Sequence, residues 1–223
     1  MADVVTLVPW RGGDAARERS WDVVRPTLED LGHPLYTGDS RGKWARAAAC
    51  NAAAAVAGDW DIALVTDADT ILEPTAVHRA IERVSRTKAA ARPHDRRWML
   101  SLAATKVVMR NGIEALKPEH LRGSAPGGGA LVIHREAWER VGGYDERFIG
   151  WGYEDSAMNI SLAVTSGWEL SEGQSYHLWH PIPNTTTSSA RANRALLDAH
   201  RAMNARAIRQ RSREAGFDLN TVL

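Results

Sequence analysis

The chain has little of what would place it outside the cell or in a membrane. Its 223 residues include a single cysteine, Cys50, so no intrachain disulfide can form, which suits a reducing compartment. The sequence has no signal peptide and no apolar run long enough to cross a bilayer. The net charge of +1 provides no general attraction to nucleic acid or to a membrane surface. From these absences we expect a cytoplasmic protein without a membrane span.

Short apolar runs alternate with helical patterns along most of the sequence. This alternation predicts parallel βαβ units, and therefore an α/β fold whose mixed, mostly parallel sheet is flanked by helices. A polar, Arg-rich stretch at 85–97 is predicted to be an exposed connection, and 124–129 and 184–189 to be loops. Strands are predicted at 4–8, 34–37, 62–66, 98–103, 106–109, 130–133 and 174–179, and helices at 14–31, 43–57, 74–84, 135–141, 155–167 and, as a basic amphipathic tail, 191–215.

Two carboxylates follow the most apolar of these strands. The strand at 62–66 runs directly into Asp67 and Asp69. An open α/β sheet places its ligand crevice at such a strand end. Asp-x-Asp offers hard oxygen ligands to a divalent cation, which in turn holds a diphosphate. By itself the tripeptide fits a turn or a helix cap equally well, because Asp favours both.

A second group of polar residues lies at 150–155, where the sequence reads Gly-Trp-Gly-Tyr-Glu-Asp. Glu154 and Asp155 fall at the start of a predicted helix, where the helix dipole favours ionised carboxylates, as a general base requires. A helix cap with a packed aromatic residue is the simpler explanation of the same pattern.

Two histidines lie close together near the end of the last predicted strand. On a strand, His177 and His180 point to opposite faces, so they ligate one ion only if the backbone turns between them. Carboxylates with one imidazole suit Mn²⁺ or a related ion. A lone histidine is more often a core or surface residue than a metal ligand.

In this order, Pro-Trp-Arg, Asp-Ala-Asp, Gly-Gly, Gly-Trp-Gly-Tyr-Glu-Asp and a late His resemble a GT-A-type glycosyltransferase. The pattern is most similar to the metal-dependent inverting β-1,4-galactosyltransferases and to the family-two-like glycosyltransferases of bacteria and phages. The resemblance spans roughly residues 3–181. It implies a GT-A catalytic domain over 1–185, followed by a loop and basic helix over 186–223. It also implies transfer of a sugar from a nucleotide-sugar, a UDP-sugar by preference, with Mn²⁺ or Mg²⁺.

The resemblance also assigns roles by position. Asp155 matches the catalytic base, and Glu154 a donor or acceptor contact beside it. Asp67, Asp69 and His180 match the metal-binding positions, with His177 as an alternate that is not His in those galactosyltransferases. The remaining positions match contacts to the nucleotide or the donor sugar, and they are Pro9, Trp10, Arg11, Arg46, Gly128, Gly129 and Trp151.

Two departures from the galactosyltransferase pattern leave the substrates open. Tyr153 stands where those enzymes have Gly, and Ser156 replaces a further acid. The acceptor is therefore a saccharide, a protein side chain or a modified nucleic acid base. Two other functions fit parts of the sequence. A nucleotidyltransferase also uses acidic metal ligands, although 9–13 is a poor phosphate loop. A non-catalytic module for carbohydrate or nucleic acid would use the arginines of the tail, which otherwise form a solvated helix face.

Overall fold

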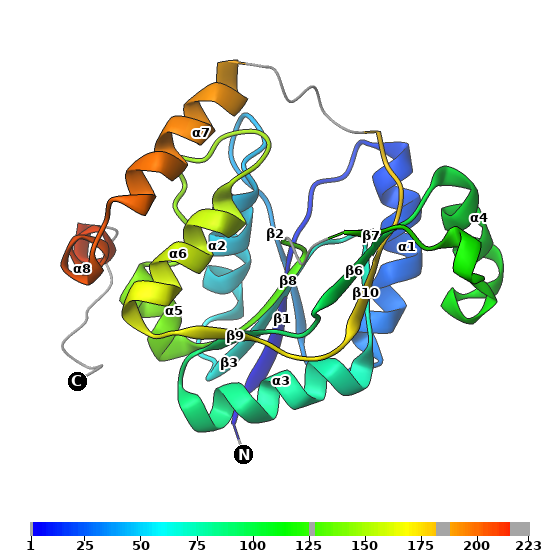
Figure 1. The fold of residues 1–223 in the computed structure, drawn as a ribbon, viewed down its shortest axis with the longest axis horizontal. Coiled ribbons are helices and arrows are strands. Elements are labelled where there is room, and N and C mark those ends of the chain that lie inside the picture. The colour runs from blue at the N-terminus through cyan, green and yellow to red at the C-terminus, as the bar shows by residue number, and fades with distance from the viewer. Residues whose placement is uncertain (1, 125–127, 182–187, 215–223) are drawn as a thin grey trace.

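A computed structural model of the chain describes residues 2–124, 128–181 and 188–214 (Figure 1). Residues 125–127 and 184–187 of the two predicted loops therefore lie outside the described residues, whereas 188 and 189, also predicted as loop, begin a helix. The described part contains a six-stranded sheet in which neighbouring strands follow the order β2-β1-β3-β8-β5-β9. These strands are β1 (Val4–Pro9), β2 (Leu35–Gly38), β3 (Ile62–Thr66), β5 (Ala90–Arg92), β8 (Ala130–His134) and β9 (Trp168–Leu170).

The sheet is mixed, as predicted. Strand β1 runs parallel to β2 and β3, whereas β8 is antiparallel to both β3 and β5. Thr66 at the end of β3 is therefore opposite Ala130 at the start of β8. The residues that follow β1 and β3 and those that precede β8 consequently meet at one edge of the sheet, which is where an α/β fold binds its ligand.

Helices cover both faces of this sheet (Figure 1). Alternate residues of β3 divide between two cores, because successive strand side chains point to opposite faces. Ala63 and Val65 pack with α2, α5 and α6, whereas Ile62 and Leu64 pack with α1, α3 and α4. These helices are α1 (Ala15–Glu29), α2 (Arg46–Ala57), α3 (Pro74–Thr87), α4 (Leu102–Asn111), α5 (Arg135–Val141) and α6 (Glu154–Thr165).

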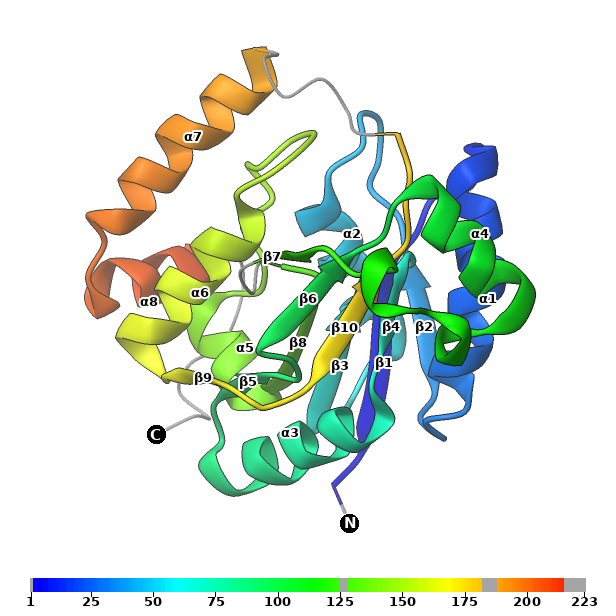
Figure 2. The same ribbon diagram turned by 45° about the vertical axis from the view of Figure 1, so that its right-hand side comes forward.

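A second, smaller sheet lies over the main sheet on the side of α1, α3 and α4 (Figure 2). Its strand order is β4-β10-β6-β7, with β10 parallel to β6 and antiparallel to β4. Short 3-10 helices at Ile113–Ala115 and Pro118–His120 connect α4 to β7. The strands are β4 (Thr70–Leu72), β6 (Arg96–Met99), β7 (Gly123–Ser124) and β10 (Gln174–His177).

Several element boundaries follow from local chemistry that the sequence displays. The Asp14 carboxylate accepts hydrogen bonds from the backbone N–H groups of Ala16 and Arg17, which caps α1 as predicted. Pro74 occupies the first turn of α3, where its missing N–H costs nothing. Gly142 ends α5 in the left-handed conformation that glycine adopts without strain.

Three predictions around residues 85–109 are wrong. The stretch 85–97 is no exposed connection, because it holds the end of α3, all of β5 and the start of β6. Arg92 is buried there, with its guanidinium 5.1 Å from the centre of the Trp168 ring, so a polar residue occupies a core strand. The predicted strand at 98–103 stops at Met99, and 106–109 is helical. Ser101 caps α4 by accepting from the Ala104 N–H, and this cap outweighs the β preference of the two valines.

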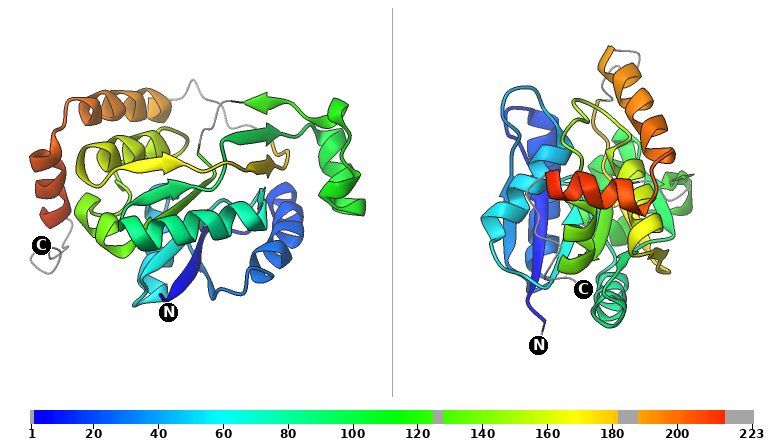
Figure 3. Two further views of the ribbon diagram at one scale, coloured as in Figure 1. Left: turned by 60° about the horizontal axis from the view of Figure 1, so that its bottom comes forward. Right: turned by 90° about the vertical axis from the view of Figure 1, so that its left-hand side faces the viewer.

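The C-terminal tail forms two helices instead of the single predicted one. Helix α7 (Ser188–Arg201) is followed by α8 (Ala205–Glu214), and Asn204 caps α8 by accepting from the Ala207 N–H. Both helices lie on the outer side of α5 and α6 (Figure 3). Ile208 of α8 is fully buried in the core that α2, α5 and α6 share. The tail is thus packed onto the sheet layer, and within the described residues no helix has the length and apolar character to cross a membrane.

This burial predicts a stability contribution from α8. Ile208→Ala removes a fully buried side chain and leaves a cavity, so we expect the free energy of unfolding to fall by about 2–5 kcal/mol. Val56→Ala, on the exposed face of α2, is the matched control because Val56 is 65% exposed. Urea unfolding followed by circular dichroism measures both. Equal midpoints for the two variants would show that α8 does not dock in solution.

Candidate active site

A cavity of about 590 Å³ opens at the sheet edge where β1, β3 and β8 meet. The residues that line it come from the loop after β1, the start of α2, the turn after β3, the start of α6 and the end of β10. All thirteen residues to which the sequence assigned a role are among them. The cavity is also lined by nine residues to which the sequence assigned no role, namely Arg17, Lys43, Trp44, Ala68, Arg97, Gly150, Gly152, Tyr153 and Ser156.

Arg46 joins the two acidic groups of the cavity. Its Nε lies 2.6 Å from Asp67 Oδ1, and its Nη1 lies 2.8 Å from Asp155 Oδ1 and 3.8 Å from Glu154 Oε1. The guanidinium also lies over the Tyr144 ring, 5.5 Å from its centre. One buried cation from α2 thus holds carboxylates from the end of β3 and the start of α6. Such hydrogen bonds between a guanidinium and a carboxylate are charge-assisted, which makes them stronger than neutral ones.

Burial and charge act in opposite directions on these groups. Burial would lower the pKa of Arg46, but the carboxylates of Asp155 and Asp67 outweigh it and raise that pKa well above its ordinary value. Burial, followed by the charge of Asp155, raises the pKa of Glu154. The side chain of Glu154 is 10% exposed and that of Asp155 is 22% exposed. Of the two acids, Asp155 is therefore the one that is more open to a ligand in the cavity.

The backbone adopts an uncommon conformation directly before Glu154 and Asp155, at the start of α6. Tyr153 caps the helix with φ +77°, a left-handed conformation that is rare for residues other than glycine. Tyr153 stands where the galactosyltransferase pattern has glycine, the residue that adopts such a conformation most readily. The aromatic side chain that results lines the cavity, with its ring 6.4 Å from that of Trp151 and 5.7 Å from the Arg194 guanidinium.

Gly128 and Gly129 form the cavity floor between Asp155 and β3. A Cβ on Gly128 would lie 1.6 Å from Asp155 Oδ2, so a larger residue would collide with the carboxylate. The Gly129 carbonyl accepts hydrogen bonds from the Asp67 N–H and the Thr66 hydroxyl. The glycine pair is thereby fixed beside the end of β3, and its lack of side chains leaves room for a ligand above it.

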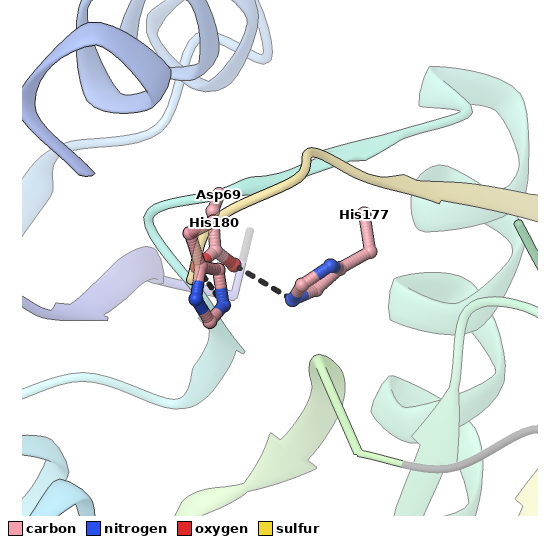
Figure 4. Close-up of side chains that lie close together, drawn as sticks. All are labelled: Asp69, His177 and His180. Carbon is pink, nitrogen blue, oxygen red and sulfur yellow. Dashed lines mark ion pairs between the residues drawn. The ribbon is translucent and has the colours of Figure 1, made fainter. Parts of the chain in front are cut away.

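Three side chains on the other side of the cavity could hold a metal ion (Figure 4). Asp69 Oδ1 lies 3.5 Å from His177 Nε2, and Asp69 Oδ2 lies 3.4 Å from His180 Nε2. The His180 Nδ1 lies 2.9 Å from the Pro181 carbonyl, which can only accept, so Nδ1 carries the proton and Nε2 of the neutral ring is free to ligate. Burial lowers the pKa of His177, despite Asp69 nearby, and favours its neutral form.

These donors fit a divalent cation. Asp69 Oδ1 is buried and has no hydrogen-bond partner in the described part of the chain. An unpaired buried carboxylate oxygen that faces imidazole lone pairs is unfavourable unless a cation lies between them. One carboxylate and two imidazoles suit a divalent transition-metal ion, and Mn²⁺ is one of these.

The structure changes two details of the predicted metal site. The condition under which His177 and His180 could ligate one ion is met, because β10 ends at His177 and the chain turns there, so His177 joins His180 instead of replacing it. The Leu178 N–H donates to the Asp69 carbonyl, which draws both histidines to Asp69. Asp67, also predicted as a ligand, does not belong to this cluster of described residues, and its Oδ1 pairs with Arg46 instead.

The residues after β1 are arranged around two aromatic contacts. The Trp10 ring stacks on Trp21, with their centres 5.4 Å apart. The Arg11 guanidinium lies over Trp44, pairs with Asp39 at 2.7 Å and donates to the Gly42 carbonyl. The guanidinium of Arg11 is thus already bonded to the loop after β2, and it shapes one wall of the cavity.

Helix α7 holds the Gly-Trp-Gly loop in place. The buried Asn193 amide nitrogen lies 3.1–3.2 Å from the carbonyl oxygens of Ile149, Trp151 and Gly152, to which it donates. Deeper in the structure, the buried His200 pairs with Asp145 at 2.8 Å. The sequence did not indicate Asn193 or His200, because nothing in the local pattern of a basic tail helix predicts an interaction with residues 41–55 positions earlier.

Comparisons with known proteins agree with this geometry. Residues 110–169 match a family model described as the N-terminal domain of galactosyltransferase. This segment includes the glycine pair, Trp151, Glu154 and Asp155. No curated protein sequence matches the chain.

Solved structures share the fold over most of the chain. The Drosophila β-1,4-galactosyltransferase 7 catalytic domain with xylobiose is 15% identical, with a TM-score of 0.56 over 87% of this chain and 80% of that one. A variant of it with manganese, UDP-Gal and xylobiose is 16% identical, with a TM-score of 0.52 over 81% and 72%. Glucosyl-3-phosphoglycerate synthase from Mycobacterium tuberculosis, with Mn²⁺, UDP and phosphoglyceric acid, is 16% identical, with a TM-score of 0.52 over 91% and 79%. The predicted GT-A fold and the resemblance to GT-A glycosyltransferases are confirmed.

The metal cluster predicts direct binding of Mn²⁺. We expect His177→Ala and His180→Ala each to weaken Mn²⁺ binding by roughly ten- to a hundredfold, because each removes one of three ligands. His78→Ala is the control, since His78 is exposed on α3. Isothermal titration calorimetry with MnCl₂ measures all three variants. Unchanged affinity for His177→Ala alone would return the metal role to the set Asp67, Asp69 and His180.

Proposed function

We propose that the protein is a metal-dependent, inverting glycosyltransferase that moves a sugar from a nucleotide-sugar, a UDP-sugar by preference, to an acceptor hydroxyl. One observation carries this proposal. A single cavity holds a cluster of Asp69, His177 and His180 on one side and Asp155, at a helix N-terminus, on the other. The family-model match over the segment that contains Asp155 supports it, as do structural neighbours that hold Mn²⁺ with UDP or UDP-Gal.

Asp155 is the proposed general base. Arg46 and the Tyr144 hydroxyl both contact its Oδ1, at 2.8 Å and 3.4 Å, whereas Oδ2 lies over Gly128. Oδ2 is therefore the oxygen available to an acceptor hydroxyl above the glycine pair. A base must be fixed within hydrogen-bond reach of the proton that it removes. Arg46 provides this fixation from α2, and it also balances the negative charge of Asp67 and Glu154.

The proposed reaction is a single displacement. The acceptor oxygen forms a bond to the anomeric carbon of the sugar while the bond from that carbon to the diphosphate oxygen breaks. The electron pair of the broken bond leaves with the nucleoside diphosphate, and the acceptor proton passes to Asp155. With one base and no covalent intermediate, the anomeric configuration inverts. A divalent cation held by Asp69, His177 and His180 would neutralise charge on the diphosphate.

The other cavity residues are proposed to hold the donor. Pro9 and Trp10 follow β1 and would contact the nucleotide, while Trp151, 47% exposed at the cavity edge, would contact the donor or the acceptor. Glu154, more buried than Asp155, would accept a hydrogen bond from a sugar hydroxyl. Placing the reacting groups in one geometry in this way is a large part of the rate enhancement that such sites provide.

A nucleotide-release screen tests the proposed function. We expect turnover of a UDP-sugar with Mn²⁺, in preference to GDP- and TDP-sugars, and loss of turnover in EDTA. The assay measures the free nucleoside diphosphate released with saccharide, peptide or modified DNA acceptors. Nucleotide release at the same rate in EDTA would refute the metal assignment. The absence of release from every donor, in protein that is folded, would refute the transferase assignment.

Two substitutions distinguish the role of Asp155 from that of Glu154. Asp155→Asn keeps the size of the side chain but removes the base, so transfer should fall by roughly 100-fold or more while metal-dependent donor binding persists. Glu154→Gln should raise the KM for donor or acceptor as well as lower kcat. Steady-state kinetics and calorimetry with the donor measure both effects. Near wild-type transfer by Asp155→Asn would mean that another group is the base.

A further inference from the structure

Arg97 brings a positive charge into the cavity that the proposed reaction has not yet used. Arg97 lies on β6, where it pairs with Ser175 of β10, two residues before His177. Residues two apart on a strand share a face, so Arg97 lies on the same face of the small sheet as His177. Arg97 lines the cavity together with the metal cluster and the acidic pair.

The glycine pair places Arg97 opposite Asp155. A Cβ on Gly129 would lie 3.3 Å from the guanidinium carbon of Arg97, whereas a Cβ on Gly128 would lie 1.6 Å from Asp155 Oδ2. A ligand above these two glycines is thus flanked by the Asp155 carboxylate on one side and the Arg97 guanidinium on the other. This is the position where the donor sugar and its diphosphate meet the acceptor in the proposed reaction.

Within the described residues, Arg97 has neither an ion pair nor a hydrogen bond to another group, and its Nε is buried without a partner. Arg46, by contrast, is paired with Asp67 and Asp155, and Arg11 with Asp39. Burial is the main cause that lowers the pKa of both His177 and His94, and the positive charge of Arg97 acts in the same direction. A guanidinium with a buried N–H that has no hydrogen-bond partner is unfavourable until an acceptor, such as an anion, binds to it.

We propose that Arg97 is a substrate-binding residue that donates to a phosphate oxygen in the cavity. The position beside His177 points to the diphosphate of the donor, and the same chemistry would bind a phosphorylated acceptor. Bound to the diphosphate, Arg97 would share with the metal the negative charge that develops on the leaving group. This inference rests on the proposed function for the identity of its substrate, but its binding test is independent of turnover.

Calorimetry with two anions tests the proposal. The probes are inorganic pyrophosphate with MnCl₂, which represents the diphosphate, and phosphoglyceric acid, which represents a phosphorylated acceptor. We expect Arg97→Met to weaken the binding of at least one probe by roughly ten- to a hundredfold, the scale for a lost charge-assisted hydrogen bond. Arg96→Met is the matched control, because Arg96 lies on the same strand with its guanidinium over Trp98, on the opposite face. It should bind both probes as the wild type does.

Each outcome decides the proposal. Weaker binding of pyrophosphate alone identifies the donor diphosphate as the ligand, and weaker binding of phosphoglyceric acid alone identifies an acceptor phosphate. Unchanged binding of both probes by Arg97→Met, or no binding of either by the wild type, overturns it. Where Arg97→Met does not fold, Arg97→Gln decides by the same criteria. If Arg97→Met weakens anion binding but the wild type transfers no sugar, the proposed function alone is refuted. If the wild type transfers sugar and Arg97→Met changes neither transfer nor anion binding, this inference alone is refuted.

Discussion

The ion pairs of Arg46 are the interaction on which the site depends. Asp67, Glu154 and Asp155 come from two different elements, and three carboxylates in one partly buried cavity would repel one another. The guanidinium of Arg46 contacts all three at 2.6–3.8 Å. Because α2 packs against β1 and β2, Arg46 is fixed relative to the sheet, and its ion pairs fix the start of α6 relative to the same sheet. The acidic pair is thus placed by a helix more than 100 residues earlier in the chain.

The order of motifs made much of the site predictable. Each predicted site residue lines the same cavity, because strand ends of an α/β sheet converge at one edge and the motifs follow those ends. What could not be predicted were the partners. The sequence does not show that Asp67 pairs with Arg46, or that the backbone turns between His177 and His180. Both depend on side chains and strands that are distant in sequence, as does the contribution of Arg97.

One fold prediction failed where a polar residue is buried, and another where residues that favour strands lie in a helix. Strand β5 contains the buried Arg92, whose guanidinium lies over the Trp168 ring. A search for apolar runs therefore does not detect this strand. Residues 106–109 carry two β-branched valines, yet they continue a helix that Ser101 caps. In contrast, β1, β3 and β8 are continuous apolar runs with both faces covered, and the local pattern of such strands matches their surroundings. At the centre of the sheet, the structure that the local sequence favours is also the one that tertiary packing favours, whereas in β5 and α4 the two differ.

The contacts of Asn193 have a consequence for the order of events during synthesis. The loop that carries Trp151 is bonded to Trp44 on one side and to α7 on the other, through Gly150 and Asn193. A chain that is still being made on the ribosome can form β1, α2 and β3 early, but it lacks the donor that fixes this loop until residue 193 has emerged. The sheet is therefore available to fold first, whereas the geometry of the cavity is completed only by a segment that is translated after every strand of the sheet. Premature termination before α7 would yield a protein that retains the strands of the main sheet but lacks the fixed geometry of its cavity.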